Sequence, residues 1–422
     1  MQLEVKTILN RIQHFAGFVY QEVRLRTPRG KLRIEVRIER HRRLRGRCSE
    51  CRRSAPGYDR LPERWWLFVP LWGIVTWFLY APRRVQCPEH GVVVEHIPWS
   101  EGKRPITKAM MGFLARWARH LSWRQTARSF QTSWEAVYRS VEWFVQWGLA
   151  RRKLEGVQAI GIDEIHWGKG KRADNFLTVI YQIDSHCRRL LWVGRRRTQA
   201  TLRRGLSALG PAVVGGLRFA CSDMWRAYLK VIAIKAPQAL HVLDRFHITM
   251  HLNRAVDQVR RAESGQLRGQ PMAEKLKRMR WKLLRRGSRV RGRAKQRLCG
   301  LLRTKLATGR AWMLKETFQD FWRYRGLNWA AAFLDVWCTR ALRSRIEPMK
   351  KVARMLRTHE ELLLNWFRAK GEISSGAVEG LNNKIRVVTR RSYGFRTFDA
   401  MEIALYHTLG RLPEPETTHR FC

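Results

Sequence analysis

The sequence predicts an α/β protein of several domains, in which a mixed sheet precedes a long helical segment. Between residues 157 and 250, apolar strand-like runs alternate with helical stretches, which is typical of a mixed sheet with helices. Residues 251–370 lose the strand signals and are helical and very basic. Residues 1–100 contain strand-like runs, such as residues 31–40, in which apolar and charged side chains alternate.

The charge of the chain indicates a polyanionic partner. Its 422 residues include 83 Lys and Arg against 34 Asp and Glu, which gives a formal net charge of +49. Neutralising the phosphates of a nucleic acid needs many such cations, and this excess is larger than solubility requires. An apolar fraction of 45% excludes wholesale disorder, and 8 Cys are too few for a disulfide scaffold. We therefore expect the partner to be nucleic acid.

No membrane segment or secretion signal is expected. The most apolar run, residues 65–81, is 17 residues long and contains a proline and a glycine. It falls short of the roughly 20 apolar residues that span a bilayer. The N-terminus has no apolar stretch followed by a small-residue cleavage site. We expect a cytoplasmic, nucleoid-associated protein, in which thiols stay reduced and paired Cys indicate metal binding.

A zinc-type cluster is predicted near the N-terminus. Cys48 and Cys51 form a C-x2-C pair, and Cys87 and His90 form a C-x2-H pair 35 residues later. Two such pairs supply the four ligands of a tetrahedral structural Zn²⁺ site. The alternative is four unrelated residues, with His90 on the surface.

A helix-turn-helix is predicted over residues 101–150. A helix near residues 107–119 precedes a short helix opened by Ser122, a break at residues 131–133 and a second helix capped by Ser133. This order places a recognition helix in the major groove of DNA, and the alternative is an ordinary helical hairpin. The side chains expected to contact DNA are Arg124, Gln125, Arg128 and Arg139.

Two acids lie at the carboxyl ends of apolar strands. One strand ends at Asp163, and another, at residues 217–222, ends directly before Asp223. Hard cations such as Mg²⁺ prefer carboxylate oxygens, and two ions about 4 Å apart can clamp a phosphoryl displacement. For either acid alone, capping the following turn is an equally ordinary role.

The predicted elements occur in the order of a ribonuclease-H-like fold. The strands are expected at residues 158–163, 176–183, 189–195, 217–222 and 239–243, with helices at 199–208 and 224–236. In that fold the first and fourth strands are neighbours. Asp163 and Asp223, which are 60 residues apart, would then lie close together.

The chain resembles bacterial insertion-sequence transposases of the ISL3 family, which have a DDE catalytic domain. The matching stretches are GIDEIHWGKG (161–170), CSDMWRAYL (221–229), HVLDRFHI (241–248) and SSGAVEGLNNKIRVVTRRSYGFR (374–396). The Cys/His cluster followed by a helix-turn-helix also matches the layout of this family, although many members have Cys where this chain has His90.

The resemblance implies a catalytic triad of Asp163, Asp223 and Glu379 that binds two Mg²⁺ or Mn²⁺ ions. It also implies that Asp244 and His247 form a supporting D-x2-H signature. Apolar spacing predicts a helix over residues 376–391, on which Glu379 could alternatively be a solvated acid. The residues of this helix suited to a phosphate backbone are Asn382, Asn383, Lys384, Arg386, Arg390 and Arg391.

The distance of 156 residues from Asp223 to Glu379 leaves room for a helical insertion. Residues 275–310 contain 15 Lys and Arg and no acid, so we expect the insertion to hold DNA. Its tryptophans are expected mostly to pack between helices, with one free to stack on a base; they are Trp281, Trp312, Trp322 and Trp329.

These expectations divide the chain into a zinc-binding module and a helix-turn-helix, followed by a ribonuclease-H-like core that an all-α insertion interrupts. The boundaries are 1–100, 101–150, 151–250 for the first part of the core, 251–370 for the insertion, and 371–422 for the helix of Glu379 and the tail. The expected function is binding of terminal inverted repeats and metal-dependent DNA strand cleavage and transfer, by a homodimer or larger assembly on double-stranded DNA. The alternatives are a non-catalytic DNA-binding protein, such as a regulator or inactive remnant, and a protein that binds structured RNA.

Overall fold

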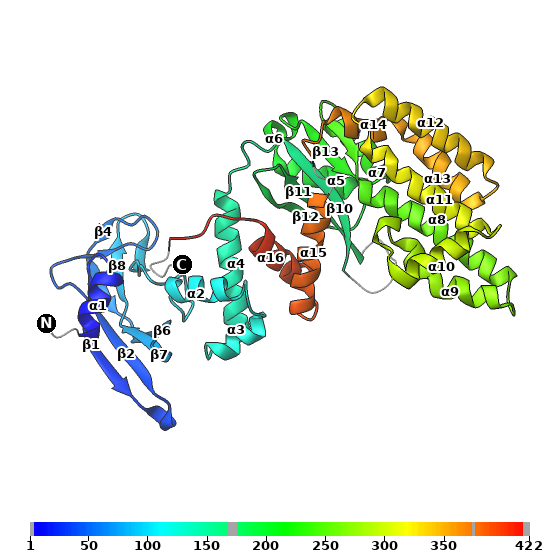
Figure 1. The fold of residues 1–422 in the computed structure, drawn as a ribbon. Helices are drawn as coiled ribbons and strands as arrows, with labels where there is room; N and C mark the ends of the chain where they lie inside the picture. Colours follow the sequence, from blue (N-terminus) through cyan, green and yellow to red (C-terminus); the bar gives the residue numbers. More distant parts are fainter. Residues whose placement is uncertain (1–3, 168–174, 374–375, 417–422) are drawn as a thin grey trace. The chain divides into compact units, whose positions relative to one another are not determined.

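The computed structural model describes residues 4–167, 175–373 and 376–416, which form two compact units (Figure 1). The first unit comprises the residues up to 153 together with those from 385 onward. The second comprises residues 154–384. Helix α15 (Gly376–Arg391) contributes its first half to the second unit and its second half to the first.

The first unit begins with helix α1 (Val5–Ile12) and a twisted sheet with strand order β1-β2-β7-β6. Its neighbours are antiparallel except for β2 and β7, which are parallel. Alternating residues of β2 point into the core, where Trp66, Phe78 and Trp99 are at most 1% exposed. The strands are β1 (Phe18–Arg26), β2 (Arg33–Arg40), β6 (Arg64–Leu71) and β7 (Ile74–Tyr80).

Two smaller sheets complete the N-terminal part of this unit. One pairs β3 (Gly46–Arg47) with β4 (Ser54–Ala55). The other has the order β5-β8-β9, with bounds Gly57–Arg60, Arg83–Cys87 and Gly91–Val94. The isolated pairing of Cys48 with Glu95 connects the end of β3 to the segment after β9. The N-terminal region is therefore mainly β, as the alternating patterns predict.

Helices make up the rest of the first unit. Ser122 caps α3 in a capping box with Gln125, and Ser133 caps α4. Both caps confirm the predicted helix starts, and α4 extends to Arg151 rather than ending at the predicted Val145, because its apolar stripe continues to Gly148. The helices are α2 (Lys108–Trp117), α3 (Trp123–Ser129), α4 (Trp134–Arg151) and α16 (Phe398–Leu409).

The second unit is built on a mixed sheet with strand order β12-β11-β10-β13-β14. β11 is antiparallel to both of its neighbours, β10 and β12, whereas β13 and β14 run parallel to β10. The first and fourth strands in sequence are thus neighbours, as predicted. The bounds are β10 (Ala159–His166), β11 (Phe176–Ile183), β12 (Arg188–Arg195), β13 (Phe219–Ser222) and β14 (Leu240–Leu243).

Helices α5 and α7 cover one face of this sheet. Ile160 and Ile162 of β10 point into a core with residues of both helices, such as Leu202 and Val231. Because side chains alternate along a strand, Gly161 and Asp163 point to the opposite face. The helices after the first three strands are α5 (Gln199–Leu209), α6 (Pro211–Gly215) and α7 (Arg226–Lys235).

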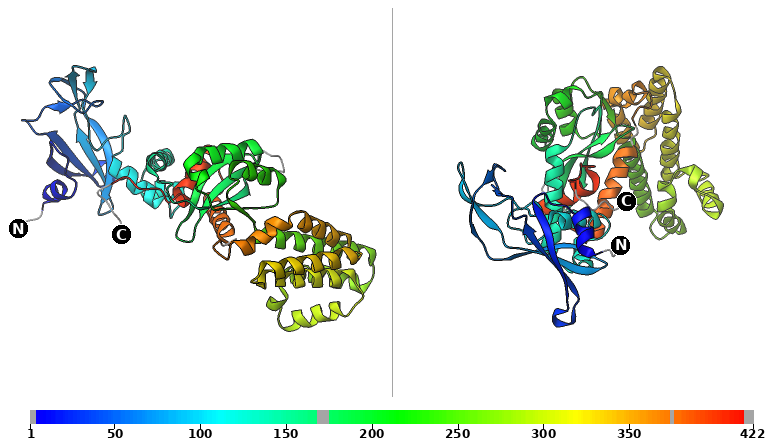
Figure 2. Two further views of the ribbon diagram at one scale, coloured as in Figure 1. Left: turned by 90° about the horizontal axis from the view of Figure 1, so that it is seen from above. Right: turned by 90° about the vertical axis from the view of Figure 1, so that its left-hand side faces the viewer.

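A helical segment follows β14 and packs around its own core, which includes Leu252, Trp312, Phe318 and Trp337. The helices lie side by side in Figures 1 and 2. It begins at Arg245 rather than near residue 251, because Asp244 caps its first helix by accepting from the Phe246 amide. The helices are α8 (Arg245–Gln266), α9 (Pro271–Leu284), α10 (Gly292–Leu302), α11 (Ala307–Thr317), α12 (Leu327–Arg343), α13 (Glu347–Thr358) and α14 (Glu360–Arg368).

None of the helices among the described residues has both the length and the apolar composition that a bilayer span requires.

Candidate functional site

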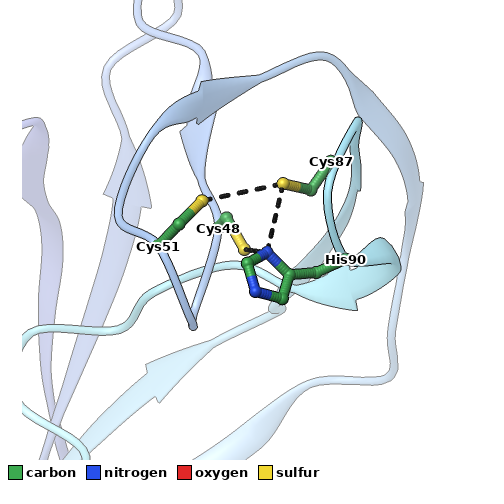
Figure 3. A group of neighbouring side chains, drawn as sticks. All are labelled: Cys48, Cys51, Cys87 and His90. Atoms are coloured by element: carbon green, nitrogen blue, oxygen red, sulfur yellow. Dashed lines mark hydrogen bonds between the residues drawn. The ribbon is translucent and has the colours of Figure 1, made fainter.

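The four predicted zinc ligands converge in the first unit (Figure 3). Cys48 and Cys51 lie in the turn between β3 and β4, whereas Cys87 is the last residue of β8 and His90 lies in the turn between β8 and β9. Their ligand atoms all lie within 4.8 Å of one another. Gly91 follows at a φ of 66°, a conformation that glycine adopts without strain.

The distances within this cluster fit a tetrahedral zinc site. Cys51 Sγ and Cys87 Sγ are 3.7 Å apart, and His90 Nδ1 lies 3.6 Å from Cys87 Sγ and 3.8 Å from Cys48 Sγ. Zn–S bonds of about 2.3 Å at tetrahedral angles place ligand atoms about 3.7 Å apart. The hydrogen bond from His90 and nearby backbone amides lower the pKa of Cys87 to about 6, which favours the thiolate that binds metal.

The residues predicted to contact DNA from the helix-turn-helix have different environments. Arg124 and Arg128 are exposed on α3. Gln125 is also exposed, but its Oε1 accepts hydrogen bonds from the Ser122 amide (3.0 Å) and hydroxyl (2.8 Å). Arg139 pairs with Glu142 of its own helix at 2.9 Å. Gln125 and Arg139 therefore make contacts within their own helix region, whereas Arg124 and Arg128 are exposed.

In the second unit, three aspartates form a row across the sheet. Gly161 pairs with Cys221, and Cys221 pairs with Val242, all in parallel register. Two residues further along each strand are Asp163, Asp223 and Asp244. The 2.8 Å bond from the Asp244 amide to the Ser222 carbonyl keeps this register beyond the strands. Three adjacent strands thus carry an acid at the same level: Asp223 and Asp244 directly follow their strands, whereas Asp163 lies within β10, which continues to His166 rather than ending at Asp163 as predicted.

Asp163 is buried and has two hydrogen-bond donors. It is 9% exposed, and its Oδ2 accepts a 2.5 Å hydrogen bond from Asn382 Nδ2. Its Oδ1 accepts one of 2.7 Å from the Glu164 amide. Burial raises the pKa of Asp163 to about 6, although the charge of His247 and these hydrogen bonds oppose the rise.

His247 connects two members of the row. Its Nδ1 lies 3.2 Å from Asp244 Oδ2, and its Nε2 lies 3.9 Å from Asp163 Oδ1. Burial disfavours the imidazolium, but the hydrogen bond with Asp244 and the charges of the neighbouring aspartates outweigh it and raise the pKa of His247 to about 9. The side chain is therefore a cation at neutral pH and offsets part of the negative charge of the row.

Glu379 lies in the first turn of α15, next to the part of that helix that packs on β10. A Cβ atom at Gly161 would come within 2.5 Å of Val378 Cγ2, so glycine allows the helix to approach the strand closely. Asn382, three residues after Glu379, reaches Asp163. Because residues three apart share a helix face, Glu379 lies on the side of α15 that faces the row, and it is half-buried.

The acids do not form a closed ligand set in this structure. Among the described residues, the Cys/His cluster is the one group of three or more His, Cys, Asp or Glu side chains that is close enough to hold an ion. Carboxylates repel one another, and the two aspartates of the predicted triad have separate protein partners: Asp163 accepts from Asn382, and Asp223 accepts from the Trp225 amide at 3.0 Å.

Sequence reasoning missed two contributors to this region. Glu164 follows Asp163 in β10 and points to the opposite face of the sheet, where its Oε2 pairs with Arg197 at 2.6 Å, while its Oε1 is buried without a hydrogen-bond partner in the described part of the chain. Its position directly after Asp163 was the available signal. The second is Tyr181, whose hydroxyl donates to Asn382 Oδ1 at 2.7 Å, and no local pattern indicates this contact.

The predicted DNA-contacting residues of α15 also separate into two groups. Asn382 was expected to face DNA, but it is 7% exposed and holds Asp163. Arg391 donates to the Arg119 carbonyl. The side chains that stay exposed are Asn383, Lys384, Arg386 and Arg390.

The tryptophans of the helical segment behave as expected only in part. Trp312 is 8% exposed and Trp322 is half-buried in the helical core, whereas Trp281 and Trp329 are 67% and 73% exposed. The side chain of Arg280 lies over the Trp281 ring, 4.8 Å from its centroid. Residues 168–170 and 374–375, which belong to two of the family-like motifs, lie outside the described residues.

Comparisons with known proteins agree with these features. The sequence model of the ISL3 transposase family, described as "Transposase", matches residues 160–405. The chain is 27% identical over 409 residues to the transposase for insertion sequence element IS1557 of Mycobacterium tuberculosis, covering 90% of each chain. It is also 27% identical over 322 residues to the transposase for IS1001 of Bordetella parapertussis, covering 75% of this chain and 78% of that one.

Proposed function

Because the chain belongs to the ISL3 family of transposases, we propose that it is a DDE transposase. It binds the terminal inverted repeats of its insertion sequence and catalyses metal-dependent strand cleavage and strand transfer. Its catalytic core is ribonuclease-H-like, with Asp163, Asp223 and Glu379 as the triad. The chain acts as a homodimer or larger assembly on double-stranded DNA, in the cytoplasm on the nucleoid.

One observation carries this proposal. Asp163 and Asp223 lie at the same level of neighbouring parallel strands. The hydrogen bond from Asn382 to Asp163 holds α15 beside them. The strand order β12-β11-β10-β13-β14 supports the ribonuclease-H-like assignment, because it joins an antiparallel three-strand element to parallel strands. Two acids that are 60 residues apart in the chain therefore lie on neighbouring strands at one level, which supports the triad assignment.

The donor set suits Mg²⁺ or Mn²⁺, which prefer carboxylate oxygens. The three triad acids would hold the ions. Two bound ions supply activation of the attacking oxygen and stabilisation of the leaving oxygen in an in-line phosphoryl displacement. Glu379 stands at the start of a helix that carries the exposed Lys384, so the same helix presents an acid for metal and a cation for the phosphate backbone.

The remaining residues of the site position these groups. Asn382 fixes the orientation of the Asp163 carboxylate, and Asp244 fixes the His247 ring. The imidazolium of His247 lies 3.9 Å from Asp163, which lowers the repulsion between the aspartates before metal and DNA bind. No covalent bond between protein and DNA is needed, so no nucleophilic Ser or Tyr is assigned.

DNA binding is distributed along the chain. The Cys/His cluster would hold a structural Zn²⁺ that shapes the N-terminal module, and the helix-turn-helix would read the repeats through Arg124 and Arg128. Residues 275–310, with their 15 cations and no acid, would hold the backbone. Cleaving both ends of one element requires two ends to be brought together, which favours an oligomer.

The test is strand cleavage of a labelled duplex that contains the end of the insertion sequence, with and without Mg²⁺. We expect Asp163→Asn, Asp223→Asn and Glu379→Gln each to abolish cleavage and to retain DNA binding. If all three variants cleave like the parent, the triad assignment is wrong. If the parent binds the duplex but never cleaves it in Mg²⁺ or Mn²⁺, the non-catalytic DNA-binding function is the correct one, consistent with the open arrangement of the acids.

A further inference from the structure

Two hairpin tips lie at the same end of the N-terminal sheet. β1 and β2 are joined by residues 27–32, and β6 and β7 are joined by Trp72 and Gly73. β2 and β7 are parallel neighbours, and Arg33 at the start of β2 pairs with Val75 near the start of β7. Both connections therefore leave the sheet at one level, where Figure 1 shows the β1–β2 hairpin continuing as an arm past β6 and β7.

The β1–β2 tip is basic and fully exposed. Every residue from 24 to 32 is exposed, and residues 24–34 contain five cations and no acid. Arg24 and Arg33 pair with Glu22 and Glu35 of the same strands. The remaining three cations, which have no acidic partner among the described residues, are Arg26, Arg29 and Lys31. This tip presents positive charge that the rest of the unit does not neutralise.

The β6–β7 tip places a tryptophan where the backbone disfavours one. Trp72 and Gly73 form a two-residue turn between the paired Leu71 and Ile74, and both have positive φ, 51° and 75°. Turns of this kind favour Asn-Gly or Gly-Gly, because a bulky side chain in the left-handed region is strained. The indole gains little from burial, since Trp72 is 72% exposed. Neither the turn nor the core of the sheet accounts for tryptophan here.

We propose that the two tips form one contact surface for duplex DNA. The Trp72 indole enters the minor groove as an apolar wedge, and Arg26, Arg29 and Lys31 face the phosphates along that groove. Exposed apolar side chains beside cations are the pair of features by which proteins hold and bend a minor groove. This inference rests on the proposed transposase function for the identity of the DNA, which is the end of the insertion sequence, and adds a contact outside the helix-turn-helix.

The variant Trp72→Asn separates this role from a structural one. Asn-Gly is the preferred sequence for such a turn, so we expect a thermal unfolding midpoint equal to or above that of the parent. We expect the dissociation constant for a fluorescent 40-base-pair duplex from the element's end to rise about tenfold. The double variant Arg29→Ala/Lys31→Ala should lower the slope of log affinity against log salt by about 1.8, because each phosphate contact contributes about 0.9.

Ile12→Ala is the matched control, since Ile12 is 57% exposed on α1 and lies at neither tip. It should leave both the affinity and the salt slope unchanged. The inference is overturned if Trp72→Asn binds the duplex as tightly as the parent and the double variant keeps the parental slope. That outcome does not affect the triad assignment, because the triad is tested by a different measurement, strand cleavage by the variants of the three acids.

Discussion

Asn382 Nδ2 donates a 2.5 Å hydrogen bond to Asp163 Oδ2, and Asn382 Oδ1 accepts one of 2.7 Å from the Tyr181 hydroxyl. Because an ionised carboxylate can only accept, the amide nitrogen of Asn382 must face Asp163, and the amide oxygen then faces the Tyr181 hydroxyl, which donates to it. Tyr181 is fully buried and Asn382 nearly so. This chain of two bonds therefore fixes the orientation of the Asp163 carboxylate, whose Oδ1 also accepts from the Glu164 amide.

Replacing Asn382 should impair cleavage without impairing DNA binding. A hydrogen bond to a charged group contributes about 1.5–3 kcal/mol, so Asn382→Ala should slow single-turnover cleavage at saturating DNA by about 10- to 100-fold. Tyr181→Phe keeps the ring but removes the hydroxyl that orients the Asn382 amide. It should slow single-turnover cleavage less than Asn382→Ala does. The adjacent Asn383, which is exposed, supplies the matched control. Asn383→Ala should weaken binding and leave the saturated rate unchanged; equal rates for Asn382→Ala and the parent would refute the positioning role.

Much of the second unit's sheet could be predicted because its signals are local. Apolar runs located all five strands, although β10 continues to His166 rather than ending at 163 and β13 begins at Phe219 rather than 217. The Cys/His cluster was also predictable, since a C-x2-C and a C-x2-H spacing restrict the geometry before any fold is known. In each case the residues that decide the outcome lie within a few positions of one another.

Contacts between distant segments could not be predicted in the same way. Asn382 and Asp163 are 219 residues apart, and nothing near either residue specifies the other. A partial signal existed, because Asn382 follows the buried Val378 by four residues and therefore lies on the same helix face. The basic residues around Asn382 favoured a DNA-contacting role for it, but its side chain is buried against the sheet.

Removing one zinc ligand should unfold the N-terminal module. A structural zinc site contributes folding free energy directly, so Cys87→Ala should reduce bound zinc from about one ion per chain to none and lower the thermal midpoint of the first unit. Zinc content by atomic absorption and melting by circular dichroism measure both effects. Cys299, which is exposed on α10, is the control, and Cys299→Ala should retain the metal. A parent protein purified without chelator that contains no zinc would contradict the four-ligand site.

The buried pair of Arg40 and Glu95 should stabilise the N-terminal region strongly. The two side chains are 5% and 0% exposed and 2.9 Å apart, and Glu95 also accepts from the Tyr80 hydroxyl and the Arg83 amide. Glu95→Ala leaves the guanidinium buried without its partner, so the free energy of unfolding should fall by about 3–5 kcal/mol in urea titrations.

An exposed ion pair of the same sheet provides the comparison. Glu22 pairs with Arg24, and both side chains are at least 40% exposed. Exposed pairs contribute at most about 1 kcal/mol, so Glu22→Ala should change the same free energy by less than that. If the two variants are destabilised equally, burial is not what gives the Arg40–Glu95 pair its effect.

Acid should destabilise the first unit through His407. This side chain is 5% exposed beside Phe144. Burial, together with the charges of Arg119 and Arg391, lowers the pKa of His407 to about 3. In the unfolded chain the pKa is about 6.5, so below that pH the unfolded state binds a proton that the folded state does not. Stability is therefore complete above about pH 6.5 and falls as the pH drops toward 3.

At pH 5 the free energy of unfolding should be about 2 kcal/mol lower than above pH 6.5. Each pH unit below 6.5 removes about 1.36 kcal/mol. His407→Leu removes the titrating group, so the parent should lose about 2 kcal/mol more than this variant when urea unfolding at about pH 7 is compared with about pH 5. His14→Leu changes an exposed histidine of the same unit and should keep the parental pH dependence. Identical pH dependence for His407→Leu and the parent would show that other groups cause the acid sensitivity.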